Sequence, residues 1–335
     1  MREAAKHDFL TQAGWGTARV TRLAGDASLR SYDRLLAADG GTAVLMDAPP
    51  NTGEDTRPFV RIAEFLTSRG LSAPRILARD SARGFLLLED LGDDLLARVV
   101  AADPEREMPL YAAATDALAH LHSAPPPDGL KPYGPDLMAE MACLPHDWYL
   151  RDPAPGDRVA FGALVRETIH RVAGPPSVLV LRDYHAENLL WLPDRTGPAR
   201  IGQLDFQDAM LGYPAYDLVS LLQDARRDVS PAVEAAMIDR YIATTGVDAQ
   251  RFRESYWLMG VQRALRLYGV FPRLSLKYGK PHYVEFLPRV HFYLERCLDR
   301  GGFDDLIAAV RARFAAPTPE RLTELKDKCG TFRAD

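Results

Sequence analysis

Short strand-like stretches, with turn residues between several of them, dominate the first ninety positions of the chain. Alternation with a period of two is typical of half-buried strands, whereas apolar residues three or four apart form one face of a helix. The pattern predicts helices at residues 2–12 and about 56–69, each followed by a glycine, Gly14 and Gly70, that can end it. It also predicts five strands, at residues 18–23, 31–36, 43–46, 75–78 and 85–88. We therefore expect a small α+β unit with an antiparallel sheet.

The rest of the chain is predicted to be largely helical. Apolar residues at helical spacing predict helices at residues 111–122, 157–172, 215–226, 230–244, 251–268, 282–300, 303–315 and 318–328. Three apolar runs within this region are too short for helices, and they predict one embedded β ribbon formed by residues 178–181, 189–192 and 200–204.

Length supports a division into two lobes. The chain has 335 residues, 47% of them hydrophobic, which exceeds the usual size of a single hydrophobic core. The change from strands to helices falls near residues 89–92. We expect an N-terminal lobe at residues 1–90 and a larger helical lobe at residues 91–335.

Composition narrows the class of protein. The net charge is −5 and no long basic block occurs, so a nucleic-acid-binding surface is not expected. The three cysteines, Cys143, Cys297 and Cys329, are too widely spaced for a metal pair or a disulfide framework. His120 and His122 lack zinc-ligand spacing. The N-terminus resembles no signal peptide and no apolar run spans a membrane, so we expect a soluble, cytoplasmic protein.

Chemistry-bearing residues gather around the predicted ribbon. Asp183 and Asn188 lie five positions apart between two apolar runs, and Asp205 follows the third run in the sequence Leu-Asp-Phe. Phosphoryl transfer requires an Asp that orients the attacking hydroxyl and accepts its proton, together with oxygen ligands for Mg²⁺. The order and spacing of these three residues therefore favour an ATP- and magnesium-dependent kinase.

The D-x-x-x-x-N segment followed by D-F resembles the aminoglycoside phosphotransferase and choline kinase superfamily, which is related to protein kinases. The resemblance implies a two-lobed protein-kinase-like α+β fold, with an antiparallel-sheet N-lobe that binds the nucleotide and a helical C-lobe. It implies that Asp183 is the catalytic base, Asn188 a metal ligand and Asp205 the principal Mg²⁺ ligand. Asp217 matches an Asp at a helix start that supports the catalytic loop.

The resemblance also implies where ATP binds. Four residues between the first two predicted strands, Gly25, Asp26, Ala27 and Ser28, occupy the place of the loop that covers the nucleotide phosphates. Glu89 and Leu91 occupy the hinge whose backbone contacts adenine. An ordinary hairpin turn and a plain strand-to-helix connection are the alternative interpretations of these two segments.

Two positions depart from the superfamily pattern. Met46 stands where relatives carry a lysine that binds the phosphates, and Leu181 stands where they carry a histidine. Glu64, the expected partner of that lysine, is then an ordinary surface charge. We predict that Arg30, which follows the phosphate loop, supplies the missing charge and acts in catalysis. The alternative is a catalytically weak, nucleotide-binding scaffold protein.

A closer resemblance covers roughly residues 9–300. The segments M-D-A-P-P at residues 46–50 and G-V-F-P-R-L at residues 269–274, with Arg263 between them, resemble the anomeric N-acetylmuramate/N-acetylglucosamine kinases of cell-wall recycling. That branch also lacks the strand lysine. It implies an amino-sugar substrate, with His185, Arg263 and Tyr268 as candidate contacts. Core packing is the default interpretation of each of these residues taken singly. In related bacteria, such chains are linked to a tRNA-modification ATPase, which is a further candidate partner.

The short segment between Asp205 and Asp217 indicates the size of the acceptor. Only eleven residues separate Asp205 from Asp217, which leaves no room for the activation segment and peptide platform of a protein kinase. A small-molecule acceptor is therefore expected. Another acceptor, such as an aminoglycoside, choline or homoserine, stays open as an alternative to the sugar.

Overall fold

The computed structural model describes residues 2–23 and 30–332, which form two compact units. Unit 1 contains the chain up to Leu121 together with Ala186–Ala209. Unit 2 contains His122–His185 together with the chain from Met210 onward.

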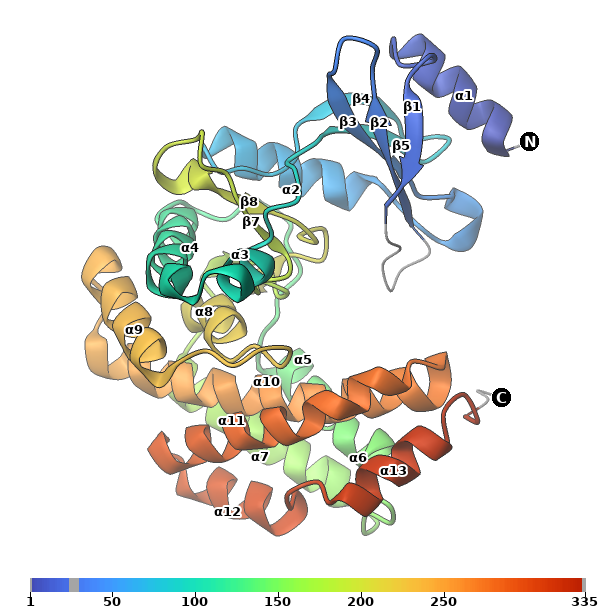
Figure 1. Cartoon of the computed structure of the whole chain (residues 1–335). Coiled ribbons are helices and arrows are strands. Elements are labelled where there is room, and N and C mark those ends of the chain that lie inside the picture. The colour runs from blue at the N-terminus through green and yellow to red at the C-terminus, as the bar shows by residue number, and fades with distance from the viewer. Residues whose placement is uncertain (1, 24–29, 333–335) are drawn as a thin grey trace. The chain divides into compact units, whose positions relative to one another are not determined.

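Unit 1 is built on a five-stranded antiparallel sheet with strand order β1-β2-β3-β5-β4 (Figure 1). The strands are β1 (Arg19–Arg22), β2 (Ser31–Leu36), β3 (Thr42–Asp47), β4 (Ile76–Asp80) and β5 (Phe85–Glu89). The hairpin between β2 and β3 turns at Gly40, whose φ of 87° lies in the left-handed region that favours glycine. All five predicted strands are present, within a few residues of their expected bounds.

The two faces of this sheet have different environments. Side chains alternate across a strand, so Leu35, Ala43, Leu45, Phe85 and Leu87 share one face, which packs against α1 (Arg2–Gln12) through buried apolar contacts. The opposite face carries the row Arg34, Val44 and Leu88, which are paired across the three central strands. This second face lines a cavity described below.

Helices and a small hairpin complete unit 1. The helices are α2 (Arg57–Ser68), α3 (Leu96–Ala102) and α4 (Glu107–His122, whose last residue belongs to unit 2), with 3₁₀ turns at Pro50–Thr52, Pro104–Arg106 and Gly197–Arg200. The hairpin pairs β7 (Leu189–Trp191) with β8 (Ile201–Gln203). β-Bridges between Leu95 and Leu190 and between Ser72 and Gly202 attach it to the preceding chain. The hairpin therefore groups with the sheet, although a helical segment of more than sixty residues precedes it in the sequence.

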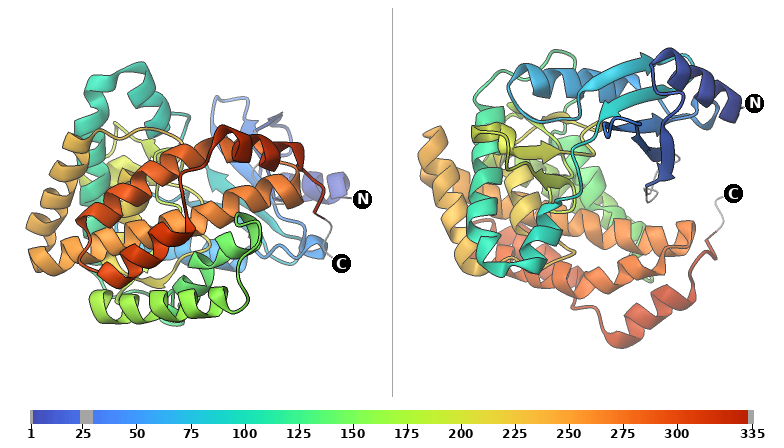
Figure 2. Two further views of the ribbon diagram at one scale, coloured as in Figure 1. Left: turned by 90° about the horizontal axis from the view of Figure 1, so that it is seen from below. Right: turned by 45° about the horizontal axis from the view of Figure 1, so that its top comes forward.

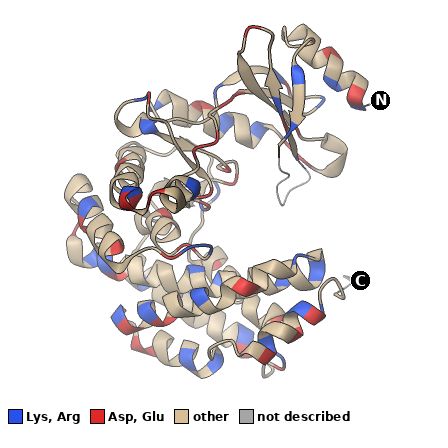
Figure 3. Cartoon of the chain, in the orientation of Figure 1, with Lys and Arg blue, Asp and Glu red and all other residues tan. Residues whose placement is uncertain are grey.

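Unit 2 is helical and centres on the 30-residue helix α10 (Figure 2). Its elements are α5 (Pro135–Ala142), α6 (Leu144–Trp148), α7 (Asp157–Ala173), β6 (Val178–Val180), β9 (Met210–Gly212), α8 (Pro214–Leu222), α9 (Pro231–Thr245), α10 (Ala249–Tyr278), η4 (Pro281–Phe286), α11 (Leu287–Arg300), α12 (Asp304–Arg313) and α13 (Pro319–Asp327). Charges of both signs mix along α11 to α13 (Figure 3), where Arg311 bridges Glu295 and Asp299. Among the described helices, none has the length and apolarity that a bilayer crossing requires.

Several predictions of local structure were wrong. The expected single β ribbon is two separate two-stranded sheets, because β6 pairs with the unpredicted strand β9 instead of β7. Helix α10 was expected to end at residue 268 but continues through Pro272 to Tyr278. Helices α3, α5 and α6 were not predicted. The compact units group residues 91–121 with the sheet, together with α3 and the β7–β8 hairpin. The lobe boundary near residue 90 stays a prediction.

Candidate active site

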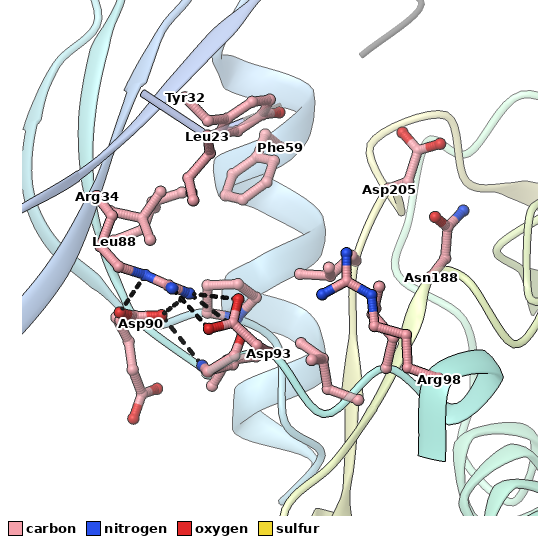
Figure 4. Close-up of a pocket in the computed structure, with 18 residues that line it drawn as sticks. Leu23, Tyr32, Arg34, Phe59, Leu88, Asp90, Asp93, Arg98, Asn188 and Asp205 are labelled. Carbon is pink, nitrogen blue, oxygen red and sulfur yellow. Dashed lines mark hydrogen bonds and ion pairs between the residues drawn. The ribbon is translucent and has the colours of Figure 1, made fainter. Parts of the chain in front are cut away.

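A cavity of about 340 Å³ lies in unit 1 on the second face of the sheet (Figure 4). Its walls are mostly apolar. The apolar lining includes Leu23, Val44, Phe59, Pro74, Leu88, Leu190 and Leu204. The segment Glu89–Gly92 forms one side of it, as the predicted hinge requires. A slot of this size and composition suits a flat heteroaromatic ring.

Arg34 fixes the hinge side of the cavity. Its Nε lies 2.8 Å from a carboxylate oxygen of Asp90, and its Nη1 lies 2.7 Å from one of Asp93. The hydrogen bond from Arg34 lowers the pKa of Asp93, so that carboxyl is ionised at neutral pH. Figure 4 shows these bonds on the hinge side, away from Asp205 and Asn188. Because Arg34 is engaged by two carboxylates, it holds the hinge rather than facing a ligand.

Asn188 and Asp205 both line this cavity, on the side opposite the hinge (Figure 4). Asn188 directly precedes β7, and Asp205 follows β8 by one residue. The backbone N–H of Leu204 donates to the carbonyl of Asn188 at 2.9 Å, which extends the β7–β8 ladder by one rung. The two side chains therefore leave adjacent ends of one hairpin, and both can offer oxygen ligands to the same ion.

Asp205 has a strained backbone. Its φ is 54°, in the left-handed region that costs a non-glycine residue about 1–3 kcal/mol. Its carboxylate accepts a hydrogen bond of 2.6 Å from the side-chain amide of Gln207. Strain at a carboxylate that faces a cavity is typical of a functional site, because the surrounding structure must hold the residue in place.

The predicted phosphate loop and its arginine have different outcomes. Gly25, Asp26, Ala27 and Ser28 lie outside the described residues. Arg30 is described, and its Nε donates to Glu54 at 2.6 Å in a mostly buried ion pair. Arg30 is not among the residues that line the cavity. A catalytic role for Arg30 stays a prediction, and this side chain would have to exchange its bond to Glu54 for one to phosphate.

In unit 2, the loop after β6 carries Asp183. Both oxygens of the buried Asp217 side chain accept backbone N–H bonds from this loop, from Leu181 at 2.6 Å and from Arg182 at 2.8 Å. Arg182 has a φ of 72°, so a second non-glycine residue in the left-handed region immediately precedes Asp183. Asp217, at the start of α8, therefore holds the loop in a conformation that costs energy, in the supporting role that the sequence predicts.

The surroundings of Asp183 keep it ionised. Burial raises the pKa of its carboxyl, but the positive charges of Arg266, Arg182 and Arg263 outweigh this effect and hold the pKa below its usual value. An ionised carboxylate can orient a hydroxyl by accepting its hydrogen bond and can take its proton. Arg266 was missed in the sequence, where nothing distinguishes it from the other basic residues of α10.

The three candidate substrate residues are buried. His185 is 4% exposed, and burial lowers its pKa to about 4, so the neutral ring can accept from Arg226 at 3.3 Å. Arg263 donates from Nη1 to the carbonyl of Gln223. Tyr268 is fully buried and packs edge-on against Tyr149. Core packing therefore accounts for Tyr268, and contacts of all three with a substrate stay predictions.

His122 and Glu64 both have partners among the described residues. His122 bonds to the hydroxyl of Tyr241 and to the carbonyl of Leu179, which is the packing role expected for it. Glu64 forms an exposed ion pair with Arg79. Within residues 2–23 and 30–332, no group of three His, Cys, Asp or Glu side chains could hold a metal ion.

Comparison with known proteins tests the predicted resemblance. Residues 19–254 match the phosphotransferase enzyme family. The chain is 39% identical to an N-acetylmuramate/N-acetylglucosamine kinase of Caulobacter vibrioides, over 95% of this chain and 97% of that protein. It is 35% identical to a protein of the same name from Pseudomonas aeruginosa, over 88% of each chain. These matches confirm the predicted resemblance.

A solved structure supports the fold. The choline kinase LicA of Streptococcus pneumoniae superimposes with a TM-score of 0.57 at 13% identity, over 88% of this chain and 99% of that one. Such a likeness shows the fold and not the substrate. It confirms the predicted kinase-like α+β architecture.

Proposed function

The chain belongs to the phosphotransferase enzyme family, and from that premise we propose that it transfers the terminal phosphoryl group of ATP to the anomeric hydroxyl of N-acetylmuramate or N-acetylglucosamine. The names of the relatives support the acceptor. The single observation that supports the nucleotide is the cavity of unit 1, in which an apolar slot beside the hinge ends at Asn188 and Asp205.

Adenine is proposed to lie in the apolar part of this cavity. Val44 and Leu88 of the sheet would contact one side of the ring, and Leu190 of β7 the other. The backbone of Glu89 and Leu91 would meet its polar edge. The triphosphate would then extend toward Asn188 and Asp205.

Asn188 and Asp205 fit a magnesium ion. Both offer hard oxygen ligands from adjacent ends of one hairpin, and Gln207 orients the Asp205 carboxylate by donating to it at 2.6 Å. Mg²⁺ usually takes one or two protein ligands and completes its shell with water and phosphate oxygens. Such an ion would neutralise charge on the phosphates during transfer.

Asp183 is proposed to orient the acceptor hydroxyl and to accept its proton. The lowered pKa of Asp183 keeps it ionised and makes it a weak base. A weak base is adequate, because the anomeric hydroxyl is more acidic than the other hydroxyls of a sugar and because phosphoryl transfer passes through a loose transition state. His185 and Arg263 would lie on the acceptor side, with Arg263 toward a lactyl carboxylate.

Phosphorus NMR tests this proposal. Enzyme, ATP and Mg²⁺ are incubated with N-acetylmuramate, N-acetylglucosamine, or choline as an unrelated acceptor. We expect a sugar 1-phosphate from the amino sugars, no product from choline, and no turnover when Mg²⁺ is withheld. Phosphate on the 6-hydroxyl, or turnover with choline alone, would contradict the acceptor while leaving the kinase assignment in place. ATP turnover without Mg²⁺ would contradict the proposed requirement for a magnesium ion.

Two further expectations belong to this proposal. The cytoplasmic location and the link to a tRNA-modification ATPase both stay predictions. Fractionation of cells would test the first, and co-purification with that ATPase the second.

A further inference from the structure

A carboxylate faces the place proposed for the ATP phosphates, because Asp205 lies at that end of the cavity. The usual strand lysine is replaced by Met46, which is 1% exposed and carries no charge. Bound Mg²⁺ offsets part of the charge, but phosphoryl-transfer sites combine the metal with a protein cation.

Two basic side chains are found among the described residues that line the cavity, Arg34 and Arg98. Arg34 is engaged by Asp90 and Asp93. Arg98, in contrast, makes no side-chain hydrogen bond or ion pair with any residue that the structure describes. It is exposed, and Figure 4 shows its guanidinium extending from α3 into the space in front of Asn188.

Backbone contacts fix the position of Arg98 relative to Asn188. The N–H of Ala97 donates to the carbonyl of Ala186 at 3.0 Å, and the N–H of Trp191 donates to the carbonyl of Asp94 at 2.8 Å. A β-bridge joins Leu95 to Leu190. The start of α3 is therefore attached on both sides of Asn188. The guanidinium can move by rotation of its own side chain, but its origin is held within this unit.

We propose that Arg98 binds phosphate oxygens of the nucleotide and supplies the charge that a strand lysine provides in related kinases. This inference depends on the proposed use of ATP. A guanidinium suits the role because its planar array of N–H donors can bind two phosphate oxygens at once. Arg98 replaces Arg30 as the candidate cation, since Arg98 lines the cavity and Arg30 is paired with Glu54.

The test compares nucleotides that differ only in phosphate. Calorimetry measures the binding of adenosine and of ADP, with and without Mg²⁺, to the full chain and to Arg98→Ala. We expect the affinity for ADP to fall about 10-fold or more and the affinity for adenosine to stay unchanged, because only ADP carries the groups that Arg98 contacts. Arg98→Lys should recover part of the loss. Arg98 is exposed on a helix, so alanine should preserve the fold.

Controls separate this role from others. Arg79→Ala removes one exposed positive charge from the same unit outside the cavity, and it should leave ADP binding unchanged. If Arg98→Ala leaves the affinity for ADP unchanged, or lowers the affinities for adenosine and ADP equally, the role of Arg98 is overturned and the proposed function is not. If Arg30→Ala lowers the affinity for ADP but not for adenosine, and Arg98→Ala does not, the cation is Arg30 and the role of Arg98 is again overturned. If the unaltered chain binds neither nucleotide, the proposed function fails as well.

Discussion

Removal of the Asp217 side chain should damage the catalytic loop without changing the nucleotide cavity. The variant Asp217→Ala deletes both acceptors of the Leu181 and Arg182 N–H groups, which are bonded at 2.6 and 2.8 Å. A hydrogen bond to a charged group contributes about 1.5–3 kcal/mol, so the pair contributes about 3–6 kcal/mol. Burial offsets part of this, since it raises the pKa of Asp217 to about 7. We expect a local loss near 3 kcal/mol.

Hydrogen exchange and kinetics report this loss separately. The amides of Leu181 and Arg182 should exchange on the order of 100-fold faster in Asp217→Ala, since 1.4 kcal/mol corresponds to a factor of ten. Turnover should fall about 100-fold, because a displacement of about 1 Å at a catalytic group has an effect of that size. ADP affinity should not change, since every residue that lines the cavity belongs to unit 1.

The matched control is Asp248→Ala. Asp248 is an exposed helix N-cap in the same unit and accepts one N–H bond, from Arg251 at 2.8 Å. Its loss should cost about 1 kcal/mol and leave turnover unchanged. If Asp217→Ala keeps normal turnover and normal protection of Leu181 and Arg182, then Asp217 does not hold the loop and our reasoning about the strain at Arg182 is wrong.

Three other predictions follow from the same structure. Asp183→Asn should reduce turnover at least 100-fold while ADP still binds, because only the proton acceptor is lost; normal turnover would exclude Asp183 as the base. Asp205→Ala should abolish the Mg²⁺ dependence of nucleotide binding in calorimetry, and an unchanged dependence would exclude it as a ligand. The pKa of His185, about 4, lies below its ordinary 6.5, so the unfolded chain takes up a proton between these values that the folded chain does not. Stability should therefore fall on acidification, by about 2 kcal/mol at pH 5 from this ring, and urea titrations of His185→Gln should show a smaller fall; equal pH dependence would contradict the burial argument.

Local patterns in the sequence predicted most elements of the fold. The strands of unit 1 are short runs rich in apolar residues with turn residues between them, and the turn at Gly40 needs the left-handed conformation that glycine adopts. These signals depend on neighbouring residues only. The pairing of β6 with β9 was missed because Met210–Gly212 is a three-residue strand, too short for any periodicity. Helix α10 was predicted too short, because the sequence does not reveal the partner helices that stabilise its extension past Pro272.

Some residues of the candidate site could also be predicted from local sequence patterns, and others could not. Asp183, Asn188 and Asp205 could be found because their spacing carries the signal. Tyr32 and Arg34 are two positions apart in β2, so their side chains lie on the same face of the sheet. Both side chains line the cavity, and this spacing could have indicated that they do so together.

Arg98 has no such signal, and this absence has a physical cause. Its place beside Asn188 depends on Ala97 and Trp191, whose N–H groups bond to Ala186 and Asp94 across almost a hundred residues of chain. Backbone bonds of this kind place no demand on side-chain identity, so they leave no pattern in the sequence. The position of Arg98 beside Asn188 thus becomes visible only through the hydrogen bonds that hold its backbone. In this chain, the groups proposed to perform chemistry can be found from their spacing, whereas the cation proposed to offset the phosphate charge requires the structure.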